Sequence, residues 1–153
     1  MTVQPTHGGA NAIAAGRLWA GGAATAVVAA LIAVVGILLA RGVFDVPILA
    51  PEGEGTWGDV DTLRYALYCA AAALVATGLL HLLLISTPRP LQFFSWIIGL
   101  ATVAATLLPF VANGTTESKI ATGLINLIVG IAIGTLLTGA ARSAMRDRRT
   151  TTY

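Results

Sequence analysis

The stretch Ser86-Thr87-Pro88-Arg89-Pro90 interrupts a sequence that is otherwise apolar over long distances. Two prolines two positions apart cannot both lie inside a helix, and each disfavours the helical conformation of the residue before it. The apolar segments on either side, 65–85 and 91–111, are each about 20 residues long, which is the length of helix that crosses about 30 Å of hydrocarbon. The short break between them predicts a tight antiparallel hairpin of membrane helices.

The composition of the whole chain is typical of a protein that faces lipid. Of the 153 residues, 56% are hydrophobic and only 10% are charged, whereas soluble domains carry about 25% charged residues. Two more apolar segments have the length of membrane spans. We therefore predict an all-α fold, a membrane four-helix bundle of antiparallel, up-and-down spans. The four spans are expected at about 18–40, 65–85, 91–111 and 120–141.

The remaining residues are predicted to flank and connect these spans. Residues 1–16 are expected to form a flexible tail, 17–142 the four-span domain, and 143–153 a basic tail. The first span is not expected to be a cleaved signal peptide. Its first positive charge comes only at Arg17, and its apolar run is longer than the about 7–15 residues of a signal peptide.

One long loop, residues 42–62, joins the first and second spans. It contains two prolines, four glycines and five acidic residues, and its conformation is not predicted. The acidic residues lack the spacing of an EF-hand, so a solvated loop is favoured over a weak calcium site. Its first half, 43–49, is apolar enough to lie against the bundle or in the headgroup layer. Helix caps are expected at the start of the second and fourth spans: Asp61 or Thr62, and Thr115 or Thr116.

The basic residues are divided unequally between the two ends of the spans. One end has six, Arg17, Arg89, Arg142, Arg146, Arg148 and Arg149, and the other has three, Arg41, Arg64 and Lys119. Short cytoplasmic loops carry the excess of basic residues, so both termini and the hairpin are predicted to be cytoplasmic and the long loop extracytoplasmic. The four arginines of the C-terminal tail are expected to contact anionic lipid headgroups.

Amino-acid usage indicates the kind of cell. Arginine outnumbers lysine eight to one, and alanine and glycine are abundant. This bias is typical of a GC-rich bacterium. The predicted location is therefore the bacterial cytoplasmic (inner) membrane, as a multi-pass protein.

None of the four predicted spans contains an aspartate, glutamate, lysine or arginine. Ion-coupled transporters usually need a buried carboxylate, so this absence argues against such a transporter and against a charged catalytic centre. The motifs of common hydrolases, zinc proteases and nucleotide-binding proteins are missing, as is a basic, aromatic face for nucleic acids. The single cysteine, Cys69, excludes an internal disulfide. We predict no catalytic residue, cofactor or metal site.

Three polar side chains within the spans are candidates for contacts between helices: His81, Thr106 and Asn126. His81 is expected about 6 Å from the cytoplasmic end of its span. A neutral histidine bonded to a neighbouring helix is favoured there over a haem or metal ligand, because one histidine cannot form a bis-histidine site in a single chain. Asn126 and Thr106 should lie at a similar depth nearer the other side, where an asparagine bond between helices contributes about 0.6–2 kcal/mol.

The fourth span carries a stripe of small residues at every fourth position. After Asn126 come Gly130, Gly134 and Thr138, and the first two form a GxxxG motif. The first span has a similar stripe at Gly22, Ala26 and Ala30. Small residues let helix backbones approach closely in a membrane. Packing within the bundle is favoured for these stripes over contact with another chain.

Three short motifs resemble those of a family of uncharacterised four-span membrane proteins of actinobacteria. They are Arg17-Leu-Trp-Ala-Gly-Gly at the start of the first span, Val46-Pro-Ile-Leu-Ala-Pro after it, and Thr87-Pro-Arg-Pro followed by Phe93 or Phe94 at the third. The resemblance covers nearly the whole chain. It implies a four-span membrane fold and no particular activity, because none is assigned to that family. Its members often have a histidine in the last span, where Asn126 stands here.

Together these features favour a small polytopic membrane protein with a structural or accessory role, packing against other membrane helices. Its expected partners are the lipid bilayer and either another membrane protein or further copies of the chain, without nucleic acid. The alternative is a small oligomeric transporter or channel for neutral or lipophilic molecules. A membrane-embedded enzyme and a haem-binding redox protein are less favoured.

Overall fold

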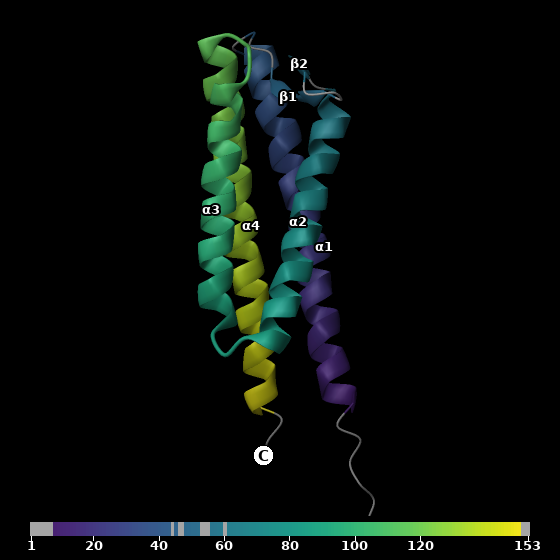
Figure 1. Cartoon of the computed structure of the whole chain (residues 1–153). Coiled ribbons are helices and arrows are strands. Elements are labelled where there is room, and N and C mark those ends of the chain that lie inside the picture. The colour runs from purple at the N-terminus through teal and green to yellow at the C-terminus, as the bar shows by residue number, and fades with distance from the viewer. Residues whose placement is uncertain (1–7, 44, 46–47, 53–55, 60, 151–153) are drawn as a thin grey trace, which may run out of the picture.

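The computed structural model describes residues 8–43, 45, 48–52, 56–59 and 61–150. The elements are α1 (Gly8–Val43), β1 (Leu49–Glu52), β2 (Thr56–Asp59), α2 (Thr62–Ser86), α3 (Pro90–Val111) and α4 (Thr116–Thr150). Consecutive helices run in opposite directions, and the strands lie at the end of the bundle away from the helical hairpin (Figure 1). All four helices are long and apolar enough to cross a membrane. The prediction of four helices, each long and apolar enough to cross a membrane, is confirmed.

The break between the second and third spans has the structure that its prolines predict. The backbone N–H and the side-chain hydroxyl of Thr87 both donate to the carbonyl of Leu83, over 3.0 and 2.6 Å. These bonds close the last turn of α2. Pro90 is the first residue of α3, where its missing N–H costs no helical hydrogen bond. Three residues therefore reverse the chain.

Two helices extend further than the predicted spans. Residues 8–16, expected as part of a flexible tail, form the start of α1, and α4 continues through Thr150 into the expected basic tail. The N-terminal stretch is rich in alanine, which has the highest helix propensity. Alanine, methionine and arginine, which also favour helices, follow the fourth span and extend α4. The predicted tail residues 1–7 and 151–153 lie outside the described part of the chain.

Both predicted helix caps are present, each formed by one of its two candidate residues. The Asp61 carboxylate accepts a hydrogen bond from the backbone N–H of Leu63 over 3.1 Å at the start of α2. The Thr115 hydroxyl accepts one from the backbone N–H of Ser118 over 3.3 Å at the start of α4. Each bond satisfies a backbone donor that the helix itself leaves unpaired.

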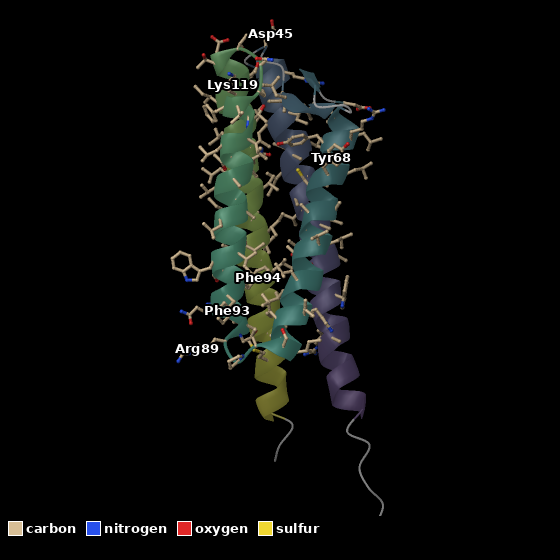
Figure 2. All side chains as sticks on the ribbon, in the orientation of Figure 1. Asp45, Tyr68, Arg89, Phe93, Phe94 and Lys119 are labelled. Atoms are coloured by element: carbon tan, nitrogen blue, oxygen red, sulfur yellow. The ribbon has the colours of Figure 1, made fainter. Side chains whose placement is uncertain are left out.

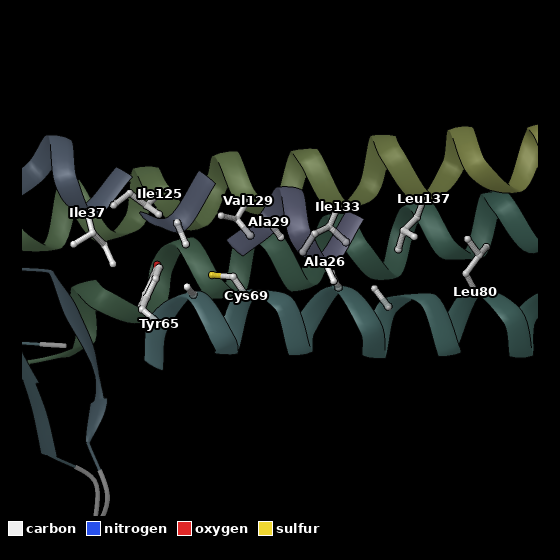
Figure 3. Packing of buried hydrophobic residues seen from close by; sticks show 14 of the residues in the cluster. Ala26, Ala29, Ile37, Tyr65, Cys69, Leu80, Ile125, Val129, Ile133 and Leu137 are labelled. Carbon is white, nitrogen blue, oxygen red and sulfur yellow. The ribbon is translucent and has the colours of Figure 1, made fainter. Parts of the chain in front are cut away.

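The core of the bundle is formed mainly by α1, α2 and α4. Small side chains let these helices approach closely: Ala29 and Ala33 on α1 and Ala73 on α2 are almost completely buried. Larger residues such as Leu80 and Leu137 fill the space between them (Figure 3). Hydrophobic side chains at a spacing of three and four residues therefore face one shared core.

Helix α3 is attached to this core by one side only. It packs along α4 and touches α2 mainly near the hairpin, and α2 and α3 diverge towards the other end of the bundle (Figure 1). Among its residues only Phe94 and Pro109 are buried. Phe94 points into the bundle while the adjacent Phe93 is 51% exposed (Figure 2). The bundle is thus open along one edge.

The long loop contains two short strands, which the all-α prediction lacks. β1 and β2 pair antiparallel, with Leu49 opposite Asp59. The predicted contact of the first half of the loop with the bundle is confirmed for Ile48 and Leu49, because both are buried. The backbone N–H of Leu49 donates to the hydroxyl of Thr122 on α4 over 3.0 Å. This bond ties the loop to the end of the bundle.

Candidate functional site

A groove of about 700 Å³ runs between α2 and α3, with α4 as its floor. We call it the α2–α3 groove. Its walls include Val75 on α2 and Leu108 on α3, which are 72% and 53% exposed. Because these rim side chains face outward, the groove opens sideways, towards the lipid that surrounds a membrane bundle. None of its lining residues is charged.

The groove is long. On α2 its lining runs from Tyr65 to Leu79, which is about 21 Å at 1.5 Å per residue. This is somewhat more than half the about 30 Å hydrocarbon thickness of a bilayer. Alanines at positions 72 and 101 form part of the opposing walls. The groove is therefore longer than the hydrocarbon of one leaflet, which is about 15 Å thick.

Polar groups are concentrated at the end of the groove near the loop. There the hydroxyl of Tyr65 on α2 donates a hydrogen bond to the side-chain oxygen of Asn126 on α4. The side-chain nitrogen of Asn126 donates to the backbone carbonyl of Ala105 on α3 over 2.8 Å. One asparagine thus joins the three helices that form the groove. Tyr65 and Cys69 project from α2 into the bundle (Figure 3).

Proline explains why Asn126 has this partner. In an uninterrupted α-helix the carbonyl of Ala105 would accept from the backbone N–H of residue 109. That residue is Pro109, which lies inside α3 and has no N–H. A free carbonyl is costly in a membrane unless another group satisfies it. Asn126 supplies the missing donor. Because the Ala105 carbonyl can only accept a hydrogen bond, the side-chain atom of Asn126 that faces it must be the amide nitrogen.

The polar end retains unused hydrogen-bonding capacity. The amide nitrogen of Asn126 carries two hydrogens, and Ala105 takes one. No other group in the described part of the chain accepts the second. The oxygen of Tyr65 donates its hydrogen to Asn126 but accepts nothing from the described residues. The hydroxyls of Tyr68 and Thr102 also line the groove and form no hydrogen bond with the described residues. The groove therefore offers several neutral donors and acceptors.

Each wall of the groove is packed through a glycine contact against a different helix. A β-carbon on Gly130 of α4 would collide with the side chain of Thr102, so this glycine allows α3 to lie close to α4. A β-carbon on Gly22 of α1 would collide with Thr77 of α2 in the same way. Each wall is therefore held by a different partner helix. The groove is the space left between two separately packed helix pairs.

The other residues of the predicted stripe lie on the same side of α4. Gly134 faces Ile98 of α3, 3.1 Å from the position of a β-carbon. The Thr138 hydroxyl donates to the carbonyl of Gly134 over 2.7 Å within its own helix. In the first span, Gly22 and Ala26 are buried and Ala30 is partly buried. These small residues face other helices of the same chain.

Two of the predicted interhelical polar residues have other contacts. The hydroxyl of Thr106 donates to the carbonyl of Thr102 over 2.8 Å in its own helix, so its expected bond between helices is not formed. The ring of His81 lies against the ring of Trp19 on α1, with centroids 6.3 Å apart. His81 also lines a second pocket, of about 620 Å³, near the hairpin. Its contact with α1 is aromatic.

No cluster of three or more potential metal ligands occurs among the side chains that the structure describes. Cys69 is a free cysteine, buried in the wall of the groove. Of the four predicted lipid-binding arginines, Arg142 is exposed on α4. The side chains of Arg146, Arg148 and Arg149 lie outside the described part of the structure.

Sequence reasoning missed three members of the polar end. Tyr65, Ala105 and Pro109 are not among the candidate residues of the sequence analysis. A usable signal was present, because a proline in a membrane helix leaves the carbonyl four residues earlier without a donor. Asn126 is the polar residue that reaches this carbonyl.

Comparison with known proteins places the chain in a family. Residues 13–143 match a family described as "Family of unknown function (DUF6069)". No curated protein and no solved structure matches the chain. The matched region extends from near the start of α1 to the last turns of α4 and so includes the whole groove. The chain therefore belongs to the family of unknown function DUF6069.

Proposed function

We propose that this protein binds a lipophilic molecule that enters the α2–α3 groove sideways from the bilayer. The observation that carries this proposal is a long, uncharged groove that is open sideways and has most of its polar side chains near one end. Ligand sites are commonly apolar hollows of about 300–1,000 Å³ with a few convergent polar groups. Binding of this kind belongs to the lipophilic-molecule alternative of the sequence analysis. It requires no catalytic residue and no cofactor.

The length of the groove favours an extended guest. Its lining on α2 runs over about 21 Å, and an extended hydrocarbon chain can lie along this length. Its volume of about 700 Å³ is within the range of small-molecule sites.

Blocking the groove is expected to abolish retention of such a guest. The substitution Ala101→Phe adds an aromatic ring to the α3 wall, where the lining residue is small. Ala104→Phe is the matched control, because Ala104 is exposed on the same helix and does not line the groove. Native mass spectrometry of protein released from nanodiscs should show bound lipid for the wild type and Ala104→Phe, and several-fold less for Ala101→Phe. Equal retention in all three proteins would contradict the proposal.

An accessory role through helix docking is the second candidate, and the outer surface of α3 favours it. Trp96 and Leu100 are 68% and 66% exposed there, and exposed apolar side chains of α3 can contact either lipid or another helix. The glycine stripes offer less support, because they are occupied within the chain. Light scattering in a mild detergent tests this candidate. A monomer without any fixed partner would count against it.

We also propose that the protein spans the bacterial cytoplasmic membrane with both termini and the hairpin in the cytoplasm, as the arginine distribution predicts. In a Cys69→Ala background, a cysteine introduced by Arg89→Cys should react with an impermeant thiol reagent only after the cells are permeabilised. A cysteine introduced by Glu117→Cys, at the exposed start of α4, should react in intact cells. The opposite pattern would reverse the proposed orientation.

A further inference from the structure

We infer that the guest of the α2–α3 groove is one acyl chain of a membrane glycerolipid, whose ester carbonyl accepts a hydrogen bond from the amide of Asn126. This inference rests on the proposed function and adds the chemical class of the ligand. It uses three observations that are independent of one another. These are the depth of the polar end, its unused donor, and the absence of charge.

The polar end lies at the depth at which glycerolipids carry their ester groups. Tyr65 is three residues after the first residue of α2, which places it about 4.5 Å along the helix. Arg64 is exposed one residue earlier, and a charged side chain at a helix end marks the headgroup region. Ester groups join the headgroup region to the acyl chains. From this level the groove continues along α2 towards the middle of the bilayer.

The hydrogen-bonding groups at this level match an ester carbonyl. The second hydrogen of the Asn126 amide has no acceptor among the described residues, and a carbonyl oxygen is an acceptor without a hydrogen of its own. An unpaired donor in a low-dielectric environment is costly. A pure hydrocarbon guest would leave this donor unsatisfied. An acyl ester satisfies it while its chain fills the apolar length.

The lack of charge distinguishes an ester from a free fatty acid. A fatty acid has a carboxylate, and a carboxylate inside hydrocarbon needs a cation or several donors. The side chains that line the groove include no lysine, arginine or histidine. The spare donors of the groove, which are the amide of Asn126 and the hydroxyls of Tyr68 and Thr102, are all neutral. The polar end therefore suits a neutral ester group of a lipid whose headgroup stays outside the groove.

The inference is tested with two phosphatidylcholines that have identical chains, one ester-linked and one ether-linked. Nanodiscs containing both in equal amounts are prepared with the protein, and the lipids retained by the released protein are counted by native mass spectrometry. The ether lipid lacks the carbonyl oxygen but keeps the chains and the headgroup. We expect the ester lipid to be enriched about two- to tenfold, which corresponds to one neutral hydrogen bond.

A double variant shows whether the preference comes from Asn126. Asn126→Leu removes the donor, and Pro109→Ala restores a backbone partner for the carbonyl of Ala105. In this double variant lipid should still be retained, but the preference for the ester lipid should disappear. A preference that persists in the double variant would overturn the inference, because the carbonyl would then be recognised elsewhere.

The outcomes separate this inference from the function on which it rests. If the two lipids are retained equally and Ala101→Phe removes both, the groove binds lipid but does not recognise the ester. If Ala101→Phe removes neither lipid, the proposed function itself is wrong. Displacement of both lipids by added oleate at low concentration would show that the site prefers a carboxylate, and would also overturn the inference.

Discussion

Gly130→Ala is expected to loosen the packing of α3 on α4 and to lower the free energy of unfolding by about 1–3 kcal/mol, the usual cost of overpacking a core. The added β-carbon would overlap both the hydroxyl and the methyl group of Thr102. No rotation of the threonine side chain removes both overlaps. The backbone of α3 must therefore move outward, and the contact that defines the floor of the groove is lost. Unfolding in a mixed-detergent titration measures the change.

Two further variants show whether the collision itself causes the loss. Gly139→Ala is the matched control on the same helix, because nothing lies within 4 Å of its β-carbon position. It is expected to be neutral or to stabilise the helix by up to about 1 kcal/mol. Combining Gly130→Ala with Thr102→Ala removes the two closest atoms but leaves the Thr102 β-carbon at 2.8 Å, so it should restore part of the stability. Equal stabilities of the two single glycine variants would show that α3 is not held to α4 at Gly130.

The same contact explains how the groove keeps its width. α3 depends on α4, through glycine contacts such as that of Gly130, whereas α2 depends on α1, through Gly22. Outward movement of α3 would widen the groove without disturbing the core of α1, α2 and α4. We therefore expect Gly130→Ala to weaken lipid retention as well as stability. The width of the groove thus depends on Gly22 and Gly130, which were predicted only to serve helix packing.

The features that sequence reasoning recovered are those encoded locally. Pro88 and Pro90 prevent one continuous helix from running through residues 86–90, and a span of apolar residues must become a helix in lipid. Asp61 and Thr115 cap helices through contacts two or three residues away. Such features depend on neighbours in the sequence. They can be predicted without knowing which helices pack together.

The groove could not be predicted in this way, because it results from the divergence of α2 and α3, which leaves part of their length without mutual contact. Nothing in the sequence of α2 or α3 indicates that these neighbours in the chain diverge while each packs on another helix. The short strands are a similar case, since Leu49 is held by Thr122, which comes 73 residues later. The hydroxyl of Thr106 was expected to bond across helices, but a carbonyl of its own helix is closer. In the first two cases the outcome is set by tertiary packing, whereas the Thr106 hydroxyl has a local partner.

Asn126→Leu is expected to lower the free energy of unfolding by about 1–3 kcal/mol, because it leaves two buried polar groups without partners. One is the hydroxyl of Tyr65, and the other is the carbonyl of Ala105 that Pro109 leaves without a helical donor. The leucine is similar in volume, so the loss of hydrogen bonds dominates over any change in packing. The same detergent titration measures this effect.

A double-mutant cycle with Pro109→Ala isolates the part due to the carbonyl. In that background residue 109 has an N–H and can satisfy Ala105 within α3, so the loss of Asn126 should cost less, by about 0.6–2 kcal/mol. Tyr65→Phe provides the complementary measurement, because it removes the hydroxyl and leaves the bond from Asn126 to Ala105 in place. If Asn126→Leu lowers the free energy of unfolding equally with proline or alanine at position 109, the asparagine does not compensate for the proline. A positive coupling would mean that Pro109 and Asn126 act as one unit, in which a defect in α3 fixes the orientation of the amide at the end of the groove.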